Sequence, residues 1–277
     1  MRDLDEQVIV VTGATSGLGR HLTGELVRAG ATVVAHGRDP SKLAGLREDL
    51  AAADGGIETV EADLADLRQV DRLAGEIAER FDRIDVLVNN AGIGFGAPGS
   101  GRETSAQGYE LRFAVNYLAG YHLTRQLVPL LVAGAPSRIV NVASIGQQAL
   151  DLDDPMVEWR HSGTVAYRRS KLAQVMFTFD LAEELVDRGV TANALHPATF
   201  MDTFMVREGG VRPLSTVDEG GAATLRLIAA PELDGVTGRF FDGTRETRPD
   251  PQADDPAARA RLRRLSDDLV AEALARR

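Results

Sequence analysis

A tyrosine and a lysine stand four residues apart in a segment that we predict to be helical. Tyr167 and Lys171 then share one face of the helix, where an ammonium favours loss of the phenolic proton below its usual pKa of about 10. The chain contains only two lysines and four tyrosines, so a Tyr-x-x-x-Lys pair arises by chance about 3% of the time. The spacing therefore favours a role in acid–base chemistry over an ordinary surface contact between two helical residues.

Two other polar residues are candidates for the same site. Ser144 follows a predicted strand, 23 residues before Tyr167, and supplies a hydroxyl group. Asn116 lies within a predicted helix, where an amide side chain is a poor helix former unless it has a task. His196 ends another apolar strand, a position where histidine is more often a hydrogen-bonded core residue than a catalyst, so we leave it out of the site.

A glycine-rich turn leads from the first predicted strand directly into a helix. Glycines let the backbone approach a pyrophosphate, which the unpaired N–H groups of a helix N-terminus can then bind. A strand-to-helix turn that merely needs glycine is the alternative. The spacing is G-x-x-x-G-x-G, and the candidate cofactor-binding residues are Gly13, Thr15, Ser16, Gly17, Leu18 and Gly19.

Two amides and a glycine cluster just beyond the fourth predicted strand, in the sequence Asn89-Asn90-Ala91-Gly92. In a doubly wound sheet, the carboxyl ends of the strands border the ligand crevice. The cluster therefore predicts cofactor contacts at Asn90, Ala91 and Gly92, although such a cluster taken alone is usually a satisfied turn.

These residues require elements that place them at one edge of a sheet. Apolar segments alternate with helical ones, which predicts a doubly wound (Rossmann) α/β fold with a seven-stranded parallel sheet and helices on both faces. The predicted strands are residues 7–12, 31–36, 57–61, 85–89, 138–144, 191–196 and 239–242. The predicted helices are residues 19–29, 40–53, 67–81, 109–132, 164–187 and 216–229, with a terminal helix in 257–277. We find no linker, so residues 1–277 are predicted to form a single domain.

The composition limits the classes of function. The net charge of −10 argues against binding to nucleic acid or to a membrane surface. Cysteine is absent, which excludes disulfides, thiolate catalysis and Cys-ligated metals, and we expect no metal site. We see no signal-peptide pattern and no apolar run long enough to span a bilayer, so we expect a cytoplasmic protein.

Together these motifs resemble the short-chain dehydrogenase/reductases over nearly the whole chain. They occur in the family's order: TGATSGLG at the glycine turn, NNAG after the fourth strand, NYLAG around Asn116, and Ser144 followed by YRRSK. Residues 150–155, residues 166–174 and the late stretch GRFFDGTRETRPDPQ resemble, more loosely, the retinol-dehydrogenase-like branch. We carry over the architecture of that branch and not its substrate.

The resemblance implies a role for each candidate catalytic residue. Tyr167 would give its proton to the substrate oxygen during reduction, and Ser144 would hydrogen-bond the same oxygen. Lys171 would lower the tyrosine pKa and hold the nicotinamide ribose, and Asn116 would seat a water that resupplies the proton. Further cofactor contacts would come from Asp63, Leu64, Tyr167, Lys171, Pro197 and Thr199.

The segment after the sixth strand departs from the family pattern. Family members often carry glycine after the residue equivalent to Pro197 and a threonine five positions beyond it. Here Ala198 replaces the glycine, and Thr203 comes one position late. Either Thr199 or Thr203 could therefore contact the nicotinamide carboxamide, and the sequence does not decide between them.

The end of the second strand predicts the choice of cofactor. NAD-binding sites usually place an acid about 20 residues past the glycine turn to bind the adenosine ribose. Here Gly37 stands in that place and Arg38 follows, which leaves room for the 2′-phosphate of NADP(H) and supplies a guanidinium to bind it. Asp39 would repel the phosphate, but Asp39 followed by Pro40 is typical of a helix cap. We expect NADP(H) rather than NAD(H).

We therefore predict an NADP(H)-dependent oxidoreductase that transfers a hydride between the cofactor and a ketone, aldehyde or alcohol, most simply as a ketoreductase with a lipophilic small-molecule substrate. Residues 147–163 and 200–213 are predicted substrate-side loops, whose Met156, Trp159, Phe204 and Met205 favour an apolar pocket with a movable cover. The alternatives are an NAD-linked alcohol dehydrogenase and a non-catalytic dinucleotide-sensing protein. The second alternative would not need Ser, Tyr and Lys at this spacing.

The predicted helices at 109–132 and 164–187 carry more apolar positions than one sheet-facing stripe needs. Examples are Leu172, Val175, Met176 and Phe179. Together with the family resemblance, this surplus predicts a homodimer or homotetramer that pairs through these helices. The identity of the substrate, the direction of the reaction and its stereochemistry stay open.

Overall fold

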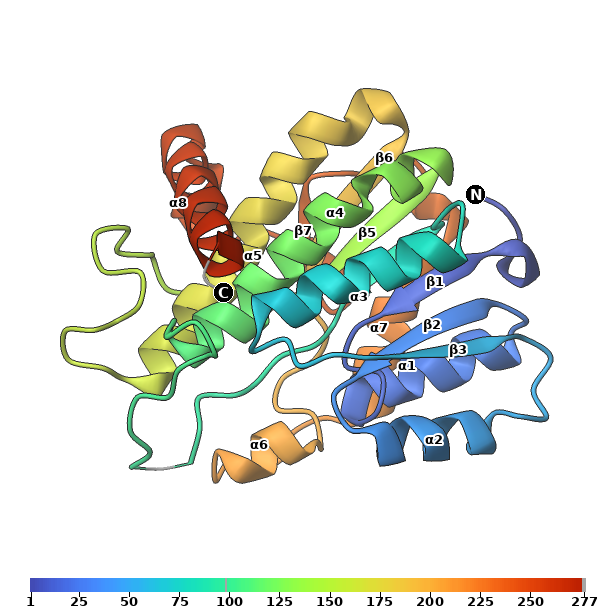
Figure 1. The fold of residues 1–277 in the computed structure, drawn as a ribbon, viewed down its shortest axis with the longest axis horizontal. Coiled ribbons are helices and arrows are strands. Elements are labelled where there is room, and N and C mark those ends of the chain that lie inside the picture. The colour runs from blue at the N-terminus through green and yellow to red at the C-terminus, as the bar shows by residue number, and fades with distance from the viewer. Residues whose placement is uncertain (98, 276–277) are drawn as a thin grey trace.

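The apolar strand segments form one sheet in the computed structural model, which describes residues 1–97 and 99–275 (Figure 1). The strand order is β3-β2-β1-β4-β5-β6-β7-β8, and the first seven strands in this order are parallel. Their continuous apolar sequences are largely buried, because helices cover both faces of a parallel sheet. The seven are β1 (Val8–Val11), β2 (Thr32–Gly37), β3 (Ile57–Glu61), β4 (Val86–Asn89), β5 (Ser137–Val142), β6 (Val190–His196) and β7 (Arg239–Asp242).

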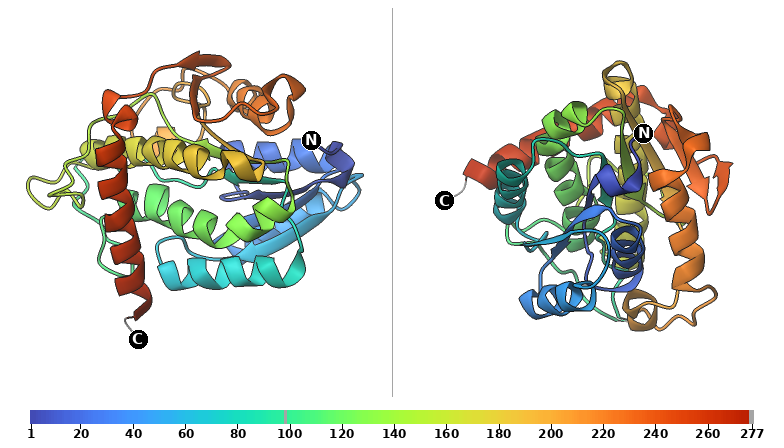
Figure 2. Two further views of the ribbon diagram at one scale, coloured as in Figure 1. Left: turned by 90° about the horizontal axis from the view of Figure 1, so that it is seen from above. Right: turned by 90° about the vertical axis from the view of Figure 1, so that its right-hand side faces the viewer.

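Two layers of helices cover the sheet and bury two separate apolar cores (Figures 1 and 2). One face carries α1 (Gly17–Arg28), α2 (Pro40–Asp49) and α7 (Val217–Ala229). The other face carries α3 (Leu67–Arg80), α4 (Ala119–Ala133) and α5 (Gly163–Leu185). Strand β1 lies between β2 and β4, so the strand order reverses there, and a crevice is expected outside the carboxyl ends of these strands.

Three local features differ from the prediction. The sheet has eight strands instead of seven, because β8 (Arg245–Thr247) adds antiparallel to β7; its three polar residues carry no apolar strand pattern. A short helix, α6 (Phe204–Glu208), interrupts the predicted loop at 200–213. The predicted helix at 109–132 contains a π-helical turn (Phe113–Leu118) before α4, and Asn116 lies within this turn. Such π-turns occur frequently at functional sites.

The terminal helix α8 (Pro256–Ala275) crosses α5, α4 and α3 near one end of their layer (Figure 2). The Tyr117 hydroxyl forms a 2.7 Å hydrogen bond with the Ser266 hydroxyl of α8. The apolar side chains of α5 that we expected to contact a second copy are largely buried within the single chain, namely Leu172, Val175 and Met176. Phe179, the fourth of these side chains, is only partly buried, and the homodimer or homotetramer stays a prediction. No helix in the described ranges is both long and apolar enough to cross a membrane.

Candidate active site

Ser144 and Tyr167 meet beyond the carboxyl end of β5. Ser144 is buried two residues after the strand ends, and its hydroxyl hydrogen-bonds with Tyr167 from the start of α5. The backbone N–H of Gly146 donates to Ser144 Oγ at 3.0 Å and fixes the position of the hydroxyl. The structure thus brings together the two hydroxyl groups that the sequence analysis assigned to one substrate oxygen.

The pKa of Tyr167 shifts in the direction opposite to our expectation. Burial raises this pKa above its usual value, and the hydrogen bond with Ser144 only partly opposes the effect. The reason is that a phenolate in the buried site would lose its solvation by water. The ammonium of Lys171, with Nζ 5.8 Å from the centre of the ring, does not offset this loss. Tyr167 is therefore protonated at neutral pH, the state that an acid needs in order to give a proton to a carbonyl oxygen.

Lys171 is buried on α5 behind this pair. Its Nζ donates to the backbone carbonyl of Val142 and to Oε1 of Gln174, both at 2.9 Å. Burial lowers the pKa of Lys171 to about 7. A Cβ on Gly92 would lie 3.5 Å from Nζ, so the backbone of Gly92 passes close beside the ammonium. No motif in the sequence indicates a role for Gln174.

Asn116 connects the loop after β4 to α5. Its Oδ1 accepts from the backbone N–H of Ile93 at 2.7 Å, and its Nδ2 donates to the Ile93 carbonyl and to the Ser170 hydroxyl. Ser170 in turn donates to the backbone carbonyl of Tyr167 at 2.7 Å. The amide therefore positions the loop beside Tyr167, and the water-holding role implied by the resemblance stays a prediction.

The glycine turn has the tight geometry that a pyrophosphate site requires. Gly13 and Gly17 have φ angles of +67° and +50°, which side-chain-bearing residues rarely adopt. A Cβ on Gly19 would lie 2.2 Å from the Gly13 carbonyl oxygen, so the start of α1 packs against the turn. Ser16 occupies the N-cap position without a side-chain capping bond, and the first turn contains no acid. The helix N-terminus therefore fits an anionic group.

The loop after β4 holds this turn in place. Asn90 Nδ2 donates to the Thr12 carbonyl at 2.8 Å, and a Cβ on Gly13 would lie 2.9 Å from the Cα of Ala91. On the other side, His36 at the end of β2 accepts from the Gly13 N–H and hydrogen-bonds with the Ala62 carbonyl. His36 is a structural residue of the turn that the sequence analysis did not identify.

The end of β2 presents the residues on which the cofactor argument depends. Arg38 is exposed, and within the described ranges no hydrogen bond or ion pair engages its guanidinium. Asp39 accepts hydrogen bonds from the N–H groups of Ser41 and Lys42, at 3.0 and 3.2 Å, which confirms that it caps α2. A Cβ on Gly37 would lie 2.6 Å from Cγ2 of Thr15, so the glycine turn packs directly against this strand end.

The two residues predicted near the adenine follow β3. Asp63 is partly exposed, and its Oδ1 accepts from the Ala65 N–H at 2.9 Å. Leu64 is buried in the core. Asp63 is therefore the one whose side chain remains accessible to a ligand.

The two threonines after Pro197 have different positions. The Thr199 hydroxyl lies 3.0 Å from His196 Nε2, and burial lowers the pKa of this histidine. A Cβ on Gly17 would lie 3.2 Å from Cγ2 of Thr203, which places Thr203 against the glycine turn. Phe200 has a φ angle of 46°, in the left-handed region. We attribute to this turn the position of Thr203 beside the glycine turn, although Thr203 comes one residue later than in the family pattern. Thr203 is the threonine near the cofactor motif.

An aromatic ring packs on Tyr167, and the segment around α6 packs against the same loop. The ring of Phe95 packs edge-to-face on Tyr167 with 6.2 Å between the ring centres. The segment around α6 lies against this loop, because a Cβ on Gly94 would lie 2.8 Å from Met205 Cγ and a Cβ on Gly209 would lie 2.5 Å from the Phe95 ring. Trp159 and Phe204 are instead largely exposed, so only part of the two predicted substrate-side loops contributes to this packing.

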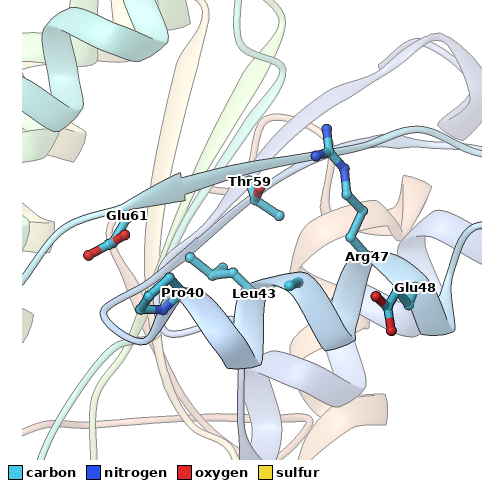
Figure 3. Close-up of a pocket in the computed structure, with 7 residues that line it drawn as sticks. Pro40, Leu43, Arg47, Glu48, Thr59 and Glu61 are labelled. Atoms are coloured by element: carbon cyan, nitrogen blue, oxygen red, sulfur yellow. The ribbon is translucent and has the colours of Figure 1, made fainter.

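Two pockets lie away from the catalytic pair. One, of about 290 Å³, lies between α2 and β3 and is lined by Pro40, Leu43, Arg47, Thr59 and other residues without a predicted catalytic or cofactor role (Figure 3). The other, of about 380 Å³, lies within the 147–163 loop and the start of α5. Its lining includes Asp151, Asp153, Asp154, Arg160 and Arg169, so this pocket is more polar than the apolar pocket that we expected from the loop.

The fold and site define a doubly wound dinucleotide-binding domain with a Ser-Tyr-Lys set at its crevice. The family model described as short chain dehydrogenase matches residues 7–210. The chain is also 36% identical to human retinol dehydrogenase 14 over 293 residues, which cover 95% of this chain and 86% of the relative. This chain belongs to the short-chain dehydrogenase family and is an oxidoreductase of its retinol-dehydrogenase-like branch.

Solved structures agree with this assignment. A protein from Mycobacterium paratuberculosis superposes with a TM-score of 0.77 at 29% identity, over 96% of this chain and 94% of that one. The RhlG protein of Pseudomonas aeruginosa, described as an NADP active-site complex, has a TM-score of 0.69 at 26% identity, over 87% of this chain and 97% of that one.

Proposed function

We propose that this chain is an NADPH-dependent reductase of lipophilic ketones or aldehydes. The observation that carries the proposal is the hydrogen-bonded pair of Ser144 and Tyr167 beside the buried amine of Lys171. When bound, the nicotinamide supplies the hydride. Ser144 and Tyr167 would both donate to the substrate carbonyl oxygen, and Tyr167 would transfer its proton there as the alcohol forms.

The preference for NADPH is supported by the free guanidinium of Arg38 beside Gly37. A phosphate on the adenosine ribose would find a cation there, while the Asp39 carboxylate is occupied by the helix cap. The NADP named for the Pseudomonas relative supports the same choice. With glycine at position 37, the strand end lacks the acid that usually binds the ribose hydroxyls of NADH.

The apolar side chains near Tyr167 support a lipophilic substrate. Phe95 packs on the tyrosine ring, Met205 packs against Gly94 of the same loop, and Ile145, next to Ser144, is 53% exposed. These side chains would gain free energy by covering an alkyl or polyene chain. The curated relatives named retinol dehydrogenases are consistent with such a substrate.

The test is NADPH oxidation at 340 nm by the purified chain with a homologous series of ketones and aldehydes, including retinal. We expect kcat/KM to rise with chain length and to exceed the value with NADH by about tenfold, the effect of one charged contact. Tyr167→Phe, which keeps the ring, is the matched control and should be inactive. No turnover of any carbonyl above the level of this variant would contradict the proposal.

A further inference from the structure

Lys171 occupies a buried position that offers its amine only neutral oxygen acceptors. Its two hydrogen-bond partners are the carbonyl of Val142, at the end of β5, and Oε1 of Gln174, one helical turn further along α5. We propose that Gln174 is a positioning residue that favours the charged form of Lys171 and holds it beside Gly92. The inference rests on the proposed function, because the resemblance assigns Lys171 to the nicotinamide ribose of the cofactor.

The geometry makes the contact specific. Lys171 and Gln174 are 4% and 5% exposed, so water does not readily replace either partner. The carbonyl of Val142 belongs to the backbone and is present whichever side chain stands there. Gln174 is therefore the acceptor that a substitution can remove. An ammonium has three N–H donors, and these two contacts use two, which leaves one for a ribose hydroxyl.

A buried network fixes the turn of α5 that carries Gln174. The Thr178 hydroxyl donates to the Gln174 backbone carbonyl at 2.7 Å and accepts from Asn141 Nδ2 of β5 at 2.8 Å. Asn141 Oδ1 in turn accepts from Asn89 of β4 at 2.8 Å. The backbone of Gln174 is therefore tied to two central strands, and its side chain has little freedom to leave the lysine.

The charges around Lys171 explain why the single amide of Gln174 can affect its protonation. The titratable groups near Lys171 are Tyr167 on its own helix and His196 on β6, and Asp242 of β7 acts on His196. No carboxylate in the described part of the chain pairs with Lys171. Because burial already lowers the pKa of Lys171 to about 7, loss of an acceptor that favours the charged form would leave the amine largely neutral at neutral pH.

The composition of the chain allows a direct test without cofactor. Lys42 and Lys171 are the only lysines in the sequence, so protein labelled with ¹³C and ¹⁵N lysine gives two side-chain signals, which Lys42→Arg assigns. We expect Gln174→Leu to lower the titration midpoint of Lys171 by about one pH unit, because a hydrogen bond to a charged group is lost. Gln174→Glu, of nearly the same size, should raise the midpoint by a similar amount or more.

Thr178→Val is the matched control, since it removes a buried hydroxyl from the same network without touching Lys171. Its midpoint should move much less than that of Gln174→Leu, because the acceptor amide stays in place. The proposal is overturned if Gln174→Leu and Thr178→Val shift the midpoint equally, or if Gln174→Glu leaves it unchanged; the Glu variant decides should the Leu variant not fold. The titration needs neither substrate nor turnover, so its failure is distinct from failure of the proposed reaction.

Discussion

Replacement of Gly37 by aspartate should not convert the enzyme to NADH unless Thr15 is shortened as well. The sequence alone suggests the double change Gly37→Asp with Arg38→Leu. In the structure, a Cβ at position 37 would lie 2.6 Å from Thr15 Cγ2, closer than real Cβ atoms approach, and 3.2 Å from Leu43 Cδ2, a tight contact. Addition of Thr15→Ala removes the nearer of these two groups and makes space for the acid.

The size of each step follows from the contacts that change. A hydrogen bond to a charged group contributes about 1.5 to 3 kcal/mol, and the exposure of Arg38 favours the lower end of that range because water screens the pair. Arg38→Leu should therefore weaken kcat/KM for NADPH by about tenfold. An aspartate that binds both ribose hydroxyls should improve NADH by a similar factor, so the triple variant should shift the ratio by about a hundredfold.

The assay is kcat/KM for both cofactors with one carbonyl substrate, measured for the wild type, Arg38→Leu, the double variant and the triple variant. Thermal unfolding without cofactor checks that each variant folds, and we expect the double variant to melt below the triple one. A wild type that uses NADH as well as NADPH would refute the role of Arg38. Equal NADH efficiency in the double and triple variants would refute the steric role of Thr15.

Three further predictions concern the ammonium, a buried ion pair and assembly. Lys171→Arg should weaken both kcat and NADPH affinity, because a planar guanidinium cannot reproduce the contacts of a compact ammonium; unchanged kinetics would contradict this. Glu110→Gln should cost about 3 kcal/mol in urea unfolding, because fully buried Glu110 pairs with buried Arg112, whereas Glu103→Gln at the half-exposed end should cost under about 1 kcal/mol. The predicted homodimer or homotetramer is checked by light scattering, and a species that is only monomeric at micromolar concentration would contradict it.

The fold was largely predictable because its signals are local. The parallel strands are short, continuous apolar runs, and the cap at Asp39 needs only an acid before Pro40. Strand β8 has neither kind of signal, since Arg245, Glu246 and Thr247 are polar and contact β7 through the backbone and through ion pairs with Arg239 and Asp242. A three-residue edge strand of this composition becomes visible only once its neighbour is placed.

The site was predictable in its residue types but not in its electrostatics. Tyr167 and Lys171 are four residues apart in any helix, so their shared face follows from the sequence. The direction of the Tyr167 pKa does not, because it depends on burial by segments distant in the chain. The positions of Gln174 and Thr203 likewise depend on how the end of β5 and the left-handed turn at Phe200 are arranged in space.

The most direct test of the account is whether the chain transfers a hydride to a carbonyl carbon under the control of Tyr167. A lipophilic ketone or aldehyde would be reduced with NADPH deuterated at both C4 positions of the nicotinamide, and the alcohol would be analysed by mass spectrometry. We predict an alcohol with one deuterium on the former carbonyl carbon from the wild type, and a rate lower by about 10² to 10⁴ from Tyr167→Phe. An alcohol without deuterium, or a Tyr167→Phe variant as fast as the wild type, would contradict the assignment.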